Sequence, residues 1–256
     1  MESKFVTKKY LKDFIFHFNG GTESLMFYND DVFLKILKKD FLTKDRKEII
    51  NRLDEFKNDN ILTPLFLLHD RTGIIGYATH NCLDYSFIDE LLTNSLFDTN
   101  IEEFKKRKDL MIKLSKTLDF LYNKEFAYYD IHYKNILLKD NNIKLIDLDG
   151  GLFRGYNNHE VTYPVAIKFS YHRLLLFTLS YIYNMDYRKF DNYFSPKNIP
   201  YQKIRTLLDY LPHDLEVLFN IIYSDEYTIN TNITNSLYEL DENTYLDTIN
   251  ILKRTN

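Results

Sequence analysis

Three polar residues between positions 128 and 151 have the types and the spacing that phosphate chemistry requires. Asp130 is followed five residues later by Asn135, and Asp147 comes twelve residues after Asn135. An aspartate beside a reacting hydroxyl can accept its proton or orient it toward a phosphoryl group. Carboxylate and amide oxygens are the ligands that Mg²⁺ prefers. Together the three residues predict transfer of a phosphoryl group with the help of a divalent metal ion.

A β-hairpin would bring the second and third of these residues together. Short apolar runs lie on both sides of the polar turn Asp140-Asn141-Asn142, within residues 136–147. A hairpin with a short turn returns the chain to the level at which its first strand began. Asn135, just before the first run, should therefore meet Asp147 at the end of the second.

The first third of the chain predicts a small sheet with one helix. Apolar and aromatic runs alternate with Asn, Gly and Asp turns over residues 12–38, which predicts a three-stranded meander. Residues 45–57 have apolar side chains at helical spacing, with Thr43 and Asp45 as candidate caps. Two further strands are expected, at residues 60–68 and 74–78.

Helical patterns dominate the rest of the chain. Thr99 and Glu102 have the spacing of a capping box, and the apolar residues after them recur on one helix face. Residues 170–256 are largely helical in pattern, and Leu174–Phe177 is expected to be the most deeply buried helical segment. The chain is thus predicted to be an α+β protein with a β-rich part, an extended connection and an α-rich part.

Bulk composition narrows the classes of partner. The chain has 256 residues, of which 45% are hydrophobic and 27% charged, as in ordinary globular domains. A net charge of −4 predicts no general attraction to nucleic acid or to a membrane surface. The sequence has no apolar stretch that could span a bilayer and no signal-peptide pattern, and its single cysteine, Cys82, fits a reducing compartment. We expect a cytoplasmic protein.

The stretch from Asp130 to Asp149 resembles the catalytic and metal-binding loops of the protein-kinase-like fold. Asp130-Ile-His-Tyr-Lys-Asn135 has the Asp-to-Asn spacing of the H-R-D-x-x-x-x-N pattern, and Asp147-Leu-Asp149 stands in the place of D-F-G. The resemblance covers about residues 14–170. It implies one domain of two lobes, a small antiparallel-sheet lobe with one helix, a hinge, and a larger helical lobe, at residues 1–79, 80–86 and 87–256.

The resemblance also implies ATP as the phosphoryl donor and Mg²⁺ or Mn²⁺ as the metal ion. Asp130 would act as the base, and Asn135 and Asp147 would hold the metal. These roles agree with the chemistry that the three residue types predict without the family.

Upstream, the resemblance implies residues that hold the nucleotide. Lys35 ends the run Val-Phe-Leu-Lys, which resembles V-A-I-K, and would contact the phosphates. An acidic residue of the predicted helix would pair with this lysine, Glu48 being the first choice and Glu55 the alternative. Gly20 and Gly21 stand where the family has a Gly-rich loop, and they would allow close approach of the backbone to phosphate.

The segment that ends the predicted sheet resembles the fifth strand and hinge of the same fold. Thr79 would then guard the back of the nucleotide pocket. Backbone groups of His80 and Cys82 would contact the adenine.

Several residues depart from the family pattern. Tyr129 replaces an Arg that usually receives an activation-loop phosphate, so that switch is not expected. His132 stands where protein Ser/Thr kinases carry a Lys and is similar to the D-x-H-x-x-N motif of aminoglycoside and choline phosphotransferases. Lys134 is the candidate for the missing charge. Asp149 replaces the Gly of D-F-G and is expected to be a further metal ligand or a loop cap.

The later part of the chain departs too. No A-P-E is present, and Thr162-Tyr163-Pro164 is the nearest analogue. The segment Ser170–Arg173 lacks the Asp that normally tethers the catalytic loop, and His172 is the candidate substitute.

The sequence therefore predicts an enzyme that transfers the ATP γ-phosphate to a hydroxyl group. A protein serine/threonine kinase is preferred, because the small lobe and hinge are similar to those of protein kinases. A small-molecule phosphotransferase is the alternative, because of His132. A pseudokinase that serves only as a binding module is the third reading. Inactive relatives commonly lose one of four residues that this chain keeps: Lys35, Asp130, Asn135 and Asp147.

Overall fold

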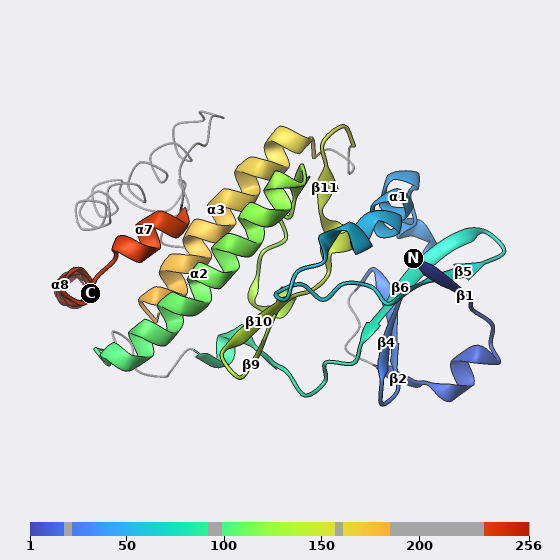
Figure 1. The fold of residues 1–256 in the computed structure, drawn as a ribbon, viewed down its shortest axis with the longest axis horizontal. Coiled ribbons are helices and arrows are strands. Elements are labelled where there is room, and N and C mark those ends of the chain that lie inside the picture. The colour runs from blue at the N-terminus through green and yellow to red at the C-terminus, as the bar shows by residue number, and fades with distance from the viewer. Residues whose placement is uncertain (18–21, 92–98, 157–160, 185–232, 256) are drawn as a thin grey trace.

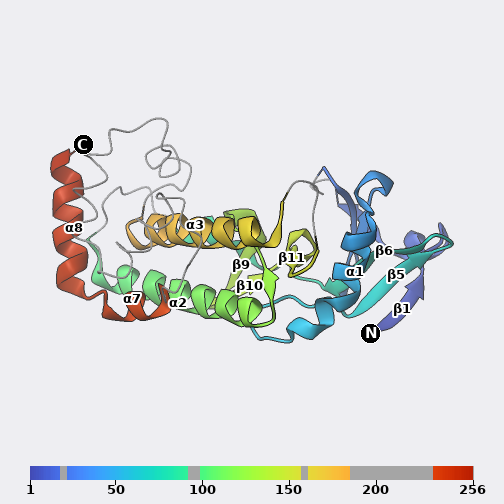
Figure 2. The same cartoon turned by 90° about the horizontal axis from the view of Figure 1, so that it is seen from above.

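The computed structural model describes residues 1–17, 22–91, 99–156, 161–184 and 233–255. The fold is mixed α+β. A mostly antiparallel sheet and helix α1 (Lys44–Arg52) lie at one end of the molecule. The long helices α2 (Ile101–Asn123) and α3 (Tyr163–Ile182) lie side by side toward the other end (Figures 1 and 2). The hairpin of β9 (Ile136–Lys139) and β10 (Asn142–Leu145) lies between these two parts, and the two chain ends lie at opposite ends of the molecule.

The main sheet has six strands in the order β1-β5-β6-β4-β3-β2. The meander predicted over residues 12–38 is confirmed as β2, β3 and β4, which pair antiparallel. The strand β1 was not predicted, because all its side chains are exposed and it joins the sheet only through parallel pairing with β5. The strands are β1 (Glu2–Phe5), β2 (Ile15–His17), β3 (Ser24–Tyr28), β4 (Val32–Leu37), β5 (Phe66–Asp70) and β6 (Gly73–His80).

Helix α1 (Lys44–Arg52) covers the sheet next to β6 and continues as a 3-10 turn over Leu53–Phe56. Thr43 is its N-cap, as predicted, and the Thr43 hydroxyl accepts a hydrogen bond from the Arg46 backbone N–H at 3.2 Å. The apolar face predicted for this segment is confirmed, because its apolar side chains are buried: Ile49, Ile50, Leu53 and Phe56.

The predicted hairpin is confirmed, with β9 (Ile136–Lys139) paired to β10 (Asn142–Leu145). Its two loop residues, Asp140 and Asn141, have φ angles of 49° and 59°. Positive φ at both central positions is the geometry of a type I′ turn, which Asp and Asn tolerate better than most residues. A short strand, β7 (Ser86–Phe87), pairs with β9 on its other side.

The other α-helices of the described residues are α2 (Ile101–Asn123), α3 (Tyr163–Ile182), α7 (Ile233–Glu239) and α8 (Glu242–Thr255). The capping box expected at Thr99 is wrong by one residue, because Asn100 caps α2 and its side-chain oxygen accepts from the backbone of Glu102 and Glu103. Asn is as good an N-cap as Thr, so residue type alone did not separate the two. The expected burial of Leu174–Phe177 holds for the three described side chains, Leu174, Leu175 and Phe177. The helices expected over 185–232 lie outside the described residues.

Three phenylalanines join the sheet end of the molecule to the segments that flank the candidate site. The Phe56 ring lies 4.6 Å from that of Phe126 and 5.5 Å from that of Phe153. Phe126 is in β8 (Phe126–Ala127), which pairs with β11 (Leu152–Phe153). A Cβ at Gly151 would lie 2.2 Å from the Phe126 ring, so only glycine fits there. This packing holds the segment before Asp130 and the segment after Asp147 against one another.

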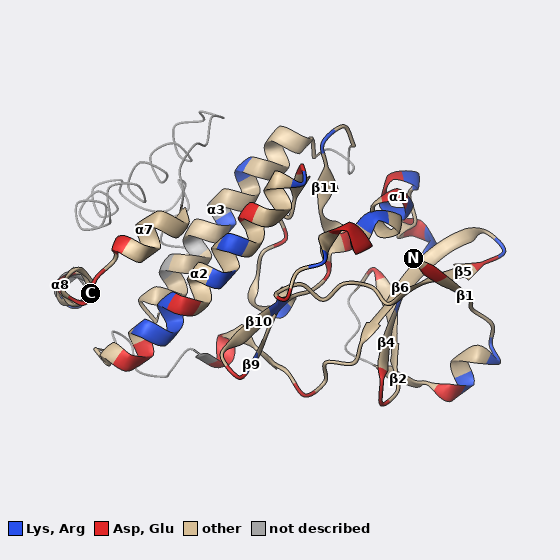
Figure 3. Cartoon of the chain, viewed as in Figure 1, with Lys and Arg blue, Asp and Glu red and all other residues tan. Residues whose placement is uncertain are grey.

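Charges of both signs are spread over the fold, and α2 carries basic and acidic residues along its length (Figure 3). Among the helices that the structure describes, none combines the length and apolarity that a bilayer crossing needs.

Candidate active site

Asp130 is fixed by the amide of Asn135. The Asn135 side-chain nitrogen donates to the Asp130 carboxylate and to the Asp130 carbonyl, each at 3.0 Å. The Asn135 side chain is buried, whereas the Asp130 side chain is 56% exposed. A carboxylate that is held in place but still faces solvent is accessible to a second molecule. It can orient a hydroxyl group of that molecule.

His132 lies beside the same carboxylate. Its Nε2 is 3.7 Å from Asp130 Oδ1, and its Nδ1 accepts a hydrogen bond from the Lys134 backbone N–H at 3.2 Å. When the imidazole is neutral, this bond places its proton on Nε2, the nitrogen that faces Asp130. His132, with Asn135 adding to the effect, lowers the pKa of Asp130 below its usual value, so Asp130 is ionised at neutral pH. The Lys134 ammonium lies over the Tyr133 ring, 5.7 Å from its centroid.

The hairpin brings Asp147 to Asn135, as predicted. The Ile146 backbone N–H donates to the Asn135 carbonyl at 3.0 Å. Asp147 follows with φ 60° and ψ 34°, a left-handed conformation that is rare for a residue other than glycine. Such strained positions gather at functional sites. The Asp147 carboxylate lies 3.1 Å from the Lys35 ammonium and stays partly exposed.

The buried hydroxyl of Tyr128 joins the segment that leads to Asp130 to the segment that leads to Asp147. It donates to the Ile146 carbonyl at 3.0 Å. Burial raises the pKa of Tyr128 well above its usual value, and the charges of Asp130 and Asp147 add to this rise.

Lys35 is held in a buried cluster around Asp149. Asp149 Oδ1 accepts from the Lys35 ammonium at 2.7 Å and from the Tyr77 hydroxyl at 2.6 Å, while its Oδ2 accepts from Arg46 Nη2 at 2.7 Å. Lys35 and Tyr77 are direct cross-strand partners on β4 and β6, so their side chains share one face of the sheet. Gly76 allows this close pairing, because a Cβ there would lie 2.0 Å from the Lys35 carbonyl oxygen.

Charges within the cluster decide its protonation. Burial opposes ionisation of Asp149, but the charges of Lys35 and Arg46 outweigh it and lower the pKa of Asp149 below its usual value. Burial likewise opposes the charged form of Lys35, but Asp147 and Asp149 raise its pKa. Lys35, Arg46 and Asp149 are thus charged at neutral pH, whereas the Tyr77 hydroxyl, whose pKa burial raises well above its usual value, stays neutral.

The expected acidic partner of Lys35 is wrong. Lys35 pairs with Asp149 and Asp147 rather than with Glu48, which accepts a hydrogen bond from Tyr156 at 2.8 Å. The alternative, Glu55, pairs with Arg52 at 2.7 Å. The reason is helix geometry, because residues two apart differ by about 200° around the axis. Arg46 faces the cluster, so the exposed Glu48 points away from it.

The expected role of Asp149 as a metal ligand is also wrong in this structure. Its side chain is fully buried, and both of its oxygens accept from Lys35, Tyr77 and Arg46. Asp149 is instead the acidic partner of Lys35.

The residues expected to form the hinge, 80–86, begin at the last residue of β6. Thr79 is buried, with its hydroxyl donating to the His80 carbonyl at 3.2 Å, and His80 is exposed. Burial raises the pKa of the Cys82 thiol to about 11, and Asp84 and Asp147 contribute. Gly20 and Gly21 lie outside the described residues.

Helix α3 holds the candidate catalytic segment through a residue that the sequence reasoning passed over. The Ser170 hydroxyl donates to the Tyr128 carbonyl at 2.7 Å. Ser170 is the first residue of the segment Ser170–Arg173, in which the family would carry its tethering Asp. The side chain of His172, the expected substitute, lies outside the described residues. The sign of this role in the sequence is a hydroxyl residue, Ser170, in the segment where the family has its tethering Asp.

The donor set fits a magnesium ion that is shared with a phosphate ligand. Among the described residues, His, Cys, Asp and Glu form no group of three or more that could hold a metal. Mg²⁺ commonly takes only one or two carboxylates together with substrate phosphates and water. Asp147 offers a carboxylate, and Asn135 uses its amide nitrogen on Asp130, so its amide oxygen would be the atom that binds a metal ion.

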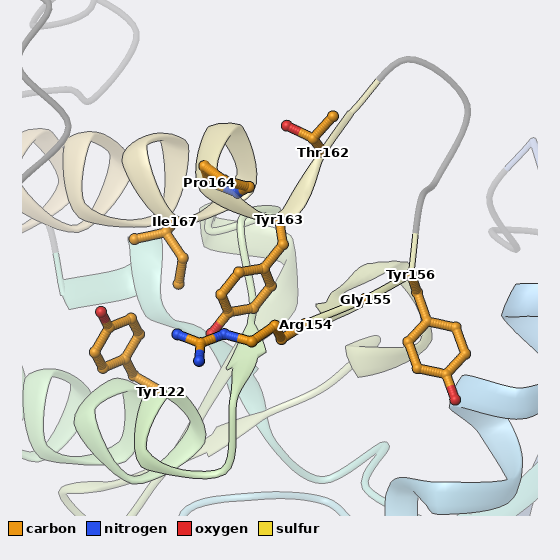
Figure 4. A pocket seen from close by; sticks show the side chains of 8 residues that line it. All are labelled: Tyr122, Arg154, Gly155, Tyr156, Thr162, Tyr163, Pro164 and Ile167. Atoms are coloured by element: carbon orange, nitrogen blue, oxygen red, sulfur yellow. The ribbon is translucent and has the colours of Figure 1, made fainter.

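A separate hollow of about 560 Å³ lies between the end of α2 and the start of α3. Figure 4 shows the Arg154 guanidinium between the rings of Tyr122 and Tyr163. Arg154 is paired with Glu125 at 2.8 Å. None of the residues that line this hollow belongs to the Lys35 cluster or to the Asp130 segment.

Comparison of the chain with protein-family models and with curated proteins gives no match. The interpretation of the site therefore depends on its own geometry.

Proposed function

We propose that the chain is an ATP- and Mg²⁺-dependent phosphotransferase of the protein-kinase-like fold. The contact that carries the proposal is Asp147 with Lys35, at 3.1 Å, because it joins the predicted metal ligand to the predicted phosphate-binding lysine. On this proposal the sheet with α1 is the small lobe, the residues after β6 are the hinge, and the helices form the large lobe. Thr79, His80 and Cys82 would line the adenine side.

Each residue of the site then has a task that its contacts support. Lys35 would place its fixed ammonium against the phosphates, held there by Asp149. Asp147 and Asn135 would hold Mg²⁺, which neutralises charge on the phosphates when bound. Asp130, ionised and exposed, would orient the acceptor hydroxyl and take its proton. His132 would keep the Asp130 carboxylate charged.

We infer that the acceptor is a protein hydroxyl, as in serine/threonine kinases. A small-molecule acceptor is the second candidate, and one observation favours it. His132 reaches to 3.7 Å from Asp130, in the place where its counterpart in the D-x-H-x-x-N motif of aminoglycoside and choline phosphotransferases stands.

The experiment is transfer of labelled γ-phosphate from ATP to a mixed set of acceptors. Casein, basic proteins and the chain itself represent proteins, and choline and aminoglycosides represent small molecules. Label on protein that is lost in Asp130→Asn supports the kinase, and label on a small molecule supports the second candidate. No transfer to any acceptor, together with no ATP hydrolysis, would contradict both.

A further inference from the structure

A single arginine joins two acidic residues that come from distant parts of the chain. Arg46, on α1, donates from Nε and Nη2 to Asp149 Oδ2 at 3.1 and 2.7 Å. Its Nη1 donates to Glu23 Oε2 at 2.6 Å. The Arg46 side chain is only 11% exposed, so its ion pair with the fully buried Asp149 is formed out of water.

The two acids have different surroundings. Asp149 is fully buried and follows the predicted metal ligand Asp147 by two residues. Glu23 is 46% exposed and lies just before β3, and its carbonyl accepts from the Lys38 backbone N–H at 2.9 Å, just after the end of β4. Arg46 therefore ties the turn after Asp147 to the start of β3, with α1 as the bridge.

Only arginine can make this connection. Its planar guanidinium carries five N–H donors in a rigid fork, so it can bind one carboxylate with two nitrogens and another with the third. A lysine would keep the positive charge but offers a single nitrogen, which cannot reproduce the same geometry.

We propose that Arg46 is a positioning residue for phosphoryl transfer: it fixes Asp149, and through Asp149 it holds the Lys35 ammonium in place. The inference depends on the proposed function. In the fold that the chain resembles, the helix supplies the acid that pairs with the strand lysine. Here the helix supplies a cation, and the acid comes from the turn after Asp147. The sign of the charge on the helix is thus reversed.

This arrangement has a functional consequence for Lys35. Asp147 is partly exposed and would turn toward the metal when nucleotide binds. Asp149 has no such second task, because all of its contacts are inside the protein. Lys35 would therefore keep one fixed partner throughout the reaction, and Arg46 would determine where that partner lies.

The test compares Arg46→Lys, Arg46→Met and Glu23→Gln with Arg52→Met as the matched control. Arg52 is on the same helix and makes the same kind of two-nitrogen pair, with Glu55 at 2.7 and 2.9 Å. For each variant kcat and KM for ATP, equilibrium ATP binding and the thermal midpoint are measured. If Arg46→Met does not fold, Arg46→Lys still tests the inference, because it keeps the positive charge beside Asp149.

We expect Arg46→Lys to stay folded and to lose about tenfold or more in kcat/KM for ATP, because its single nitrogen loses the fork. Glu23→Gln should have a smaller effect, and it should not add to that of Arg46→Lys, because the two residues share one contact. Arg52→Met should retain wild-type kcat/KM.

Two results would overturn the inference. Either Arg46→Lys keeps wild-type kinetics and ATP binding, or its loss is no larger than that of Arg52→Met at an equal thermal midpoint. A wild-type protein without ATP binding or turnover is a different failure, because it removes the proposed function and the role of Arg46 together.

Discussion

The ammonium of Lys35 lies 2.7 Å from the carboxylate of Asp149, in a buried ion pair that joins β4 to the turn after β10. Removing one partner of a buried ion pair leaves the other charge without compensation in a medium that solvates it poorly. Asp149 has two cationic partners, Lys35 and Arg46, so its neutralisation affects both. This pair therefore connects the stability of the fold to the proposed chemistry.

Replacing Asp149 should make the protein less stable and change how its stability depends on pH. The pKa of Asp149 is lowered in the folded protein, below the unfolded value of about 3.9, so its contribution to stability is complete only above about pH 5. As the pH falls below about 5, the unfolded state binds the proton first, and stability decreases until the folded pKa is passed. Asp149→Asn should be destabilised by about 3 kcal/mol at pH 7.

Urea unfolding from pH 7 down to pH 3 measures both effects. The difference between wild type and Asp149→Asn should shrink as the pH falls. Asp109→Asn, an exposed change on α2, serves as the control and should follow the wild type. A constant difference at every pH would mean that the Asp149 charge is not what stabilises the cluster.

Removing the hydroxyl of Ser170 should lower kcat more than it lowers ATP binding. Its hydrogen bond to the Tyr128 carbonyl holds the segment that leads to Asp130, and a bond of this kind contributes about 1 kcal/mol. The matched control is Ser115→Ala, which breaks another buried hydroxyl contact, to Thr234 at 2.7 Å, away from the site. Similar unfolding free energies with kcat reduced only in Ser170→Ala would support the tether. Equal kcat values in the two variants would contradict it.

Replacing His132 should raise the pKa of Asp130. His132 is the main reason that this pKa lies below its usual value, with Asn135 second. In His132→Ala the Asp130 carboxyl should therefore take up its proton at a higher pH than in the wild type. The carboxyl ¹³C chemical shift of labelled aspartate follows this directly. An unchanged Asp130 titration in the variant would show that the imidazole does not act on the carboxylate.

Secondary structure was largely predictable because the hydrophobic patterns in this chain agree with local turn and cap chemistry. Thr43 starts α1, and Asp140 with Asn141 turns the hairpin. Strand β1 escaped prediction because its exposed side chains show no pattern of burial. The proximity of Asn135 and Asp147 followed from the hairpin alone.

The contacts of individual charged side chains could not be predicted in the same way. Glu48 and Arg46 are both charged and near the start of α1, and only the rotation of the helix decides which one faces the sheet. Asp149 has the chemistry of a metal ligand, but burial beside Lys35 and Arg46 makes it an ion-pair partner. Such choices depend on tertiary packing, which a pattern of residue types does not contain.

The most direct test of the proposed function is ATP turnover with Mg²⁺ by the wild type and by Asp147→Ala, with Asp109→Asn as the control. Asp147 is the predicted metal ligand and lies 3.1 Å from Lys35, so its loss should remove a contact that the transition state needs. We expect kcat to fall at least about a hundredfold in Asp147→Ala and to be unchanged in Asp109→Asn. Equal turnover in wild type and Asp147→Ala would contradict the proposed function.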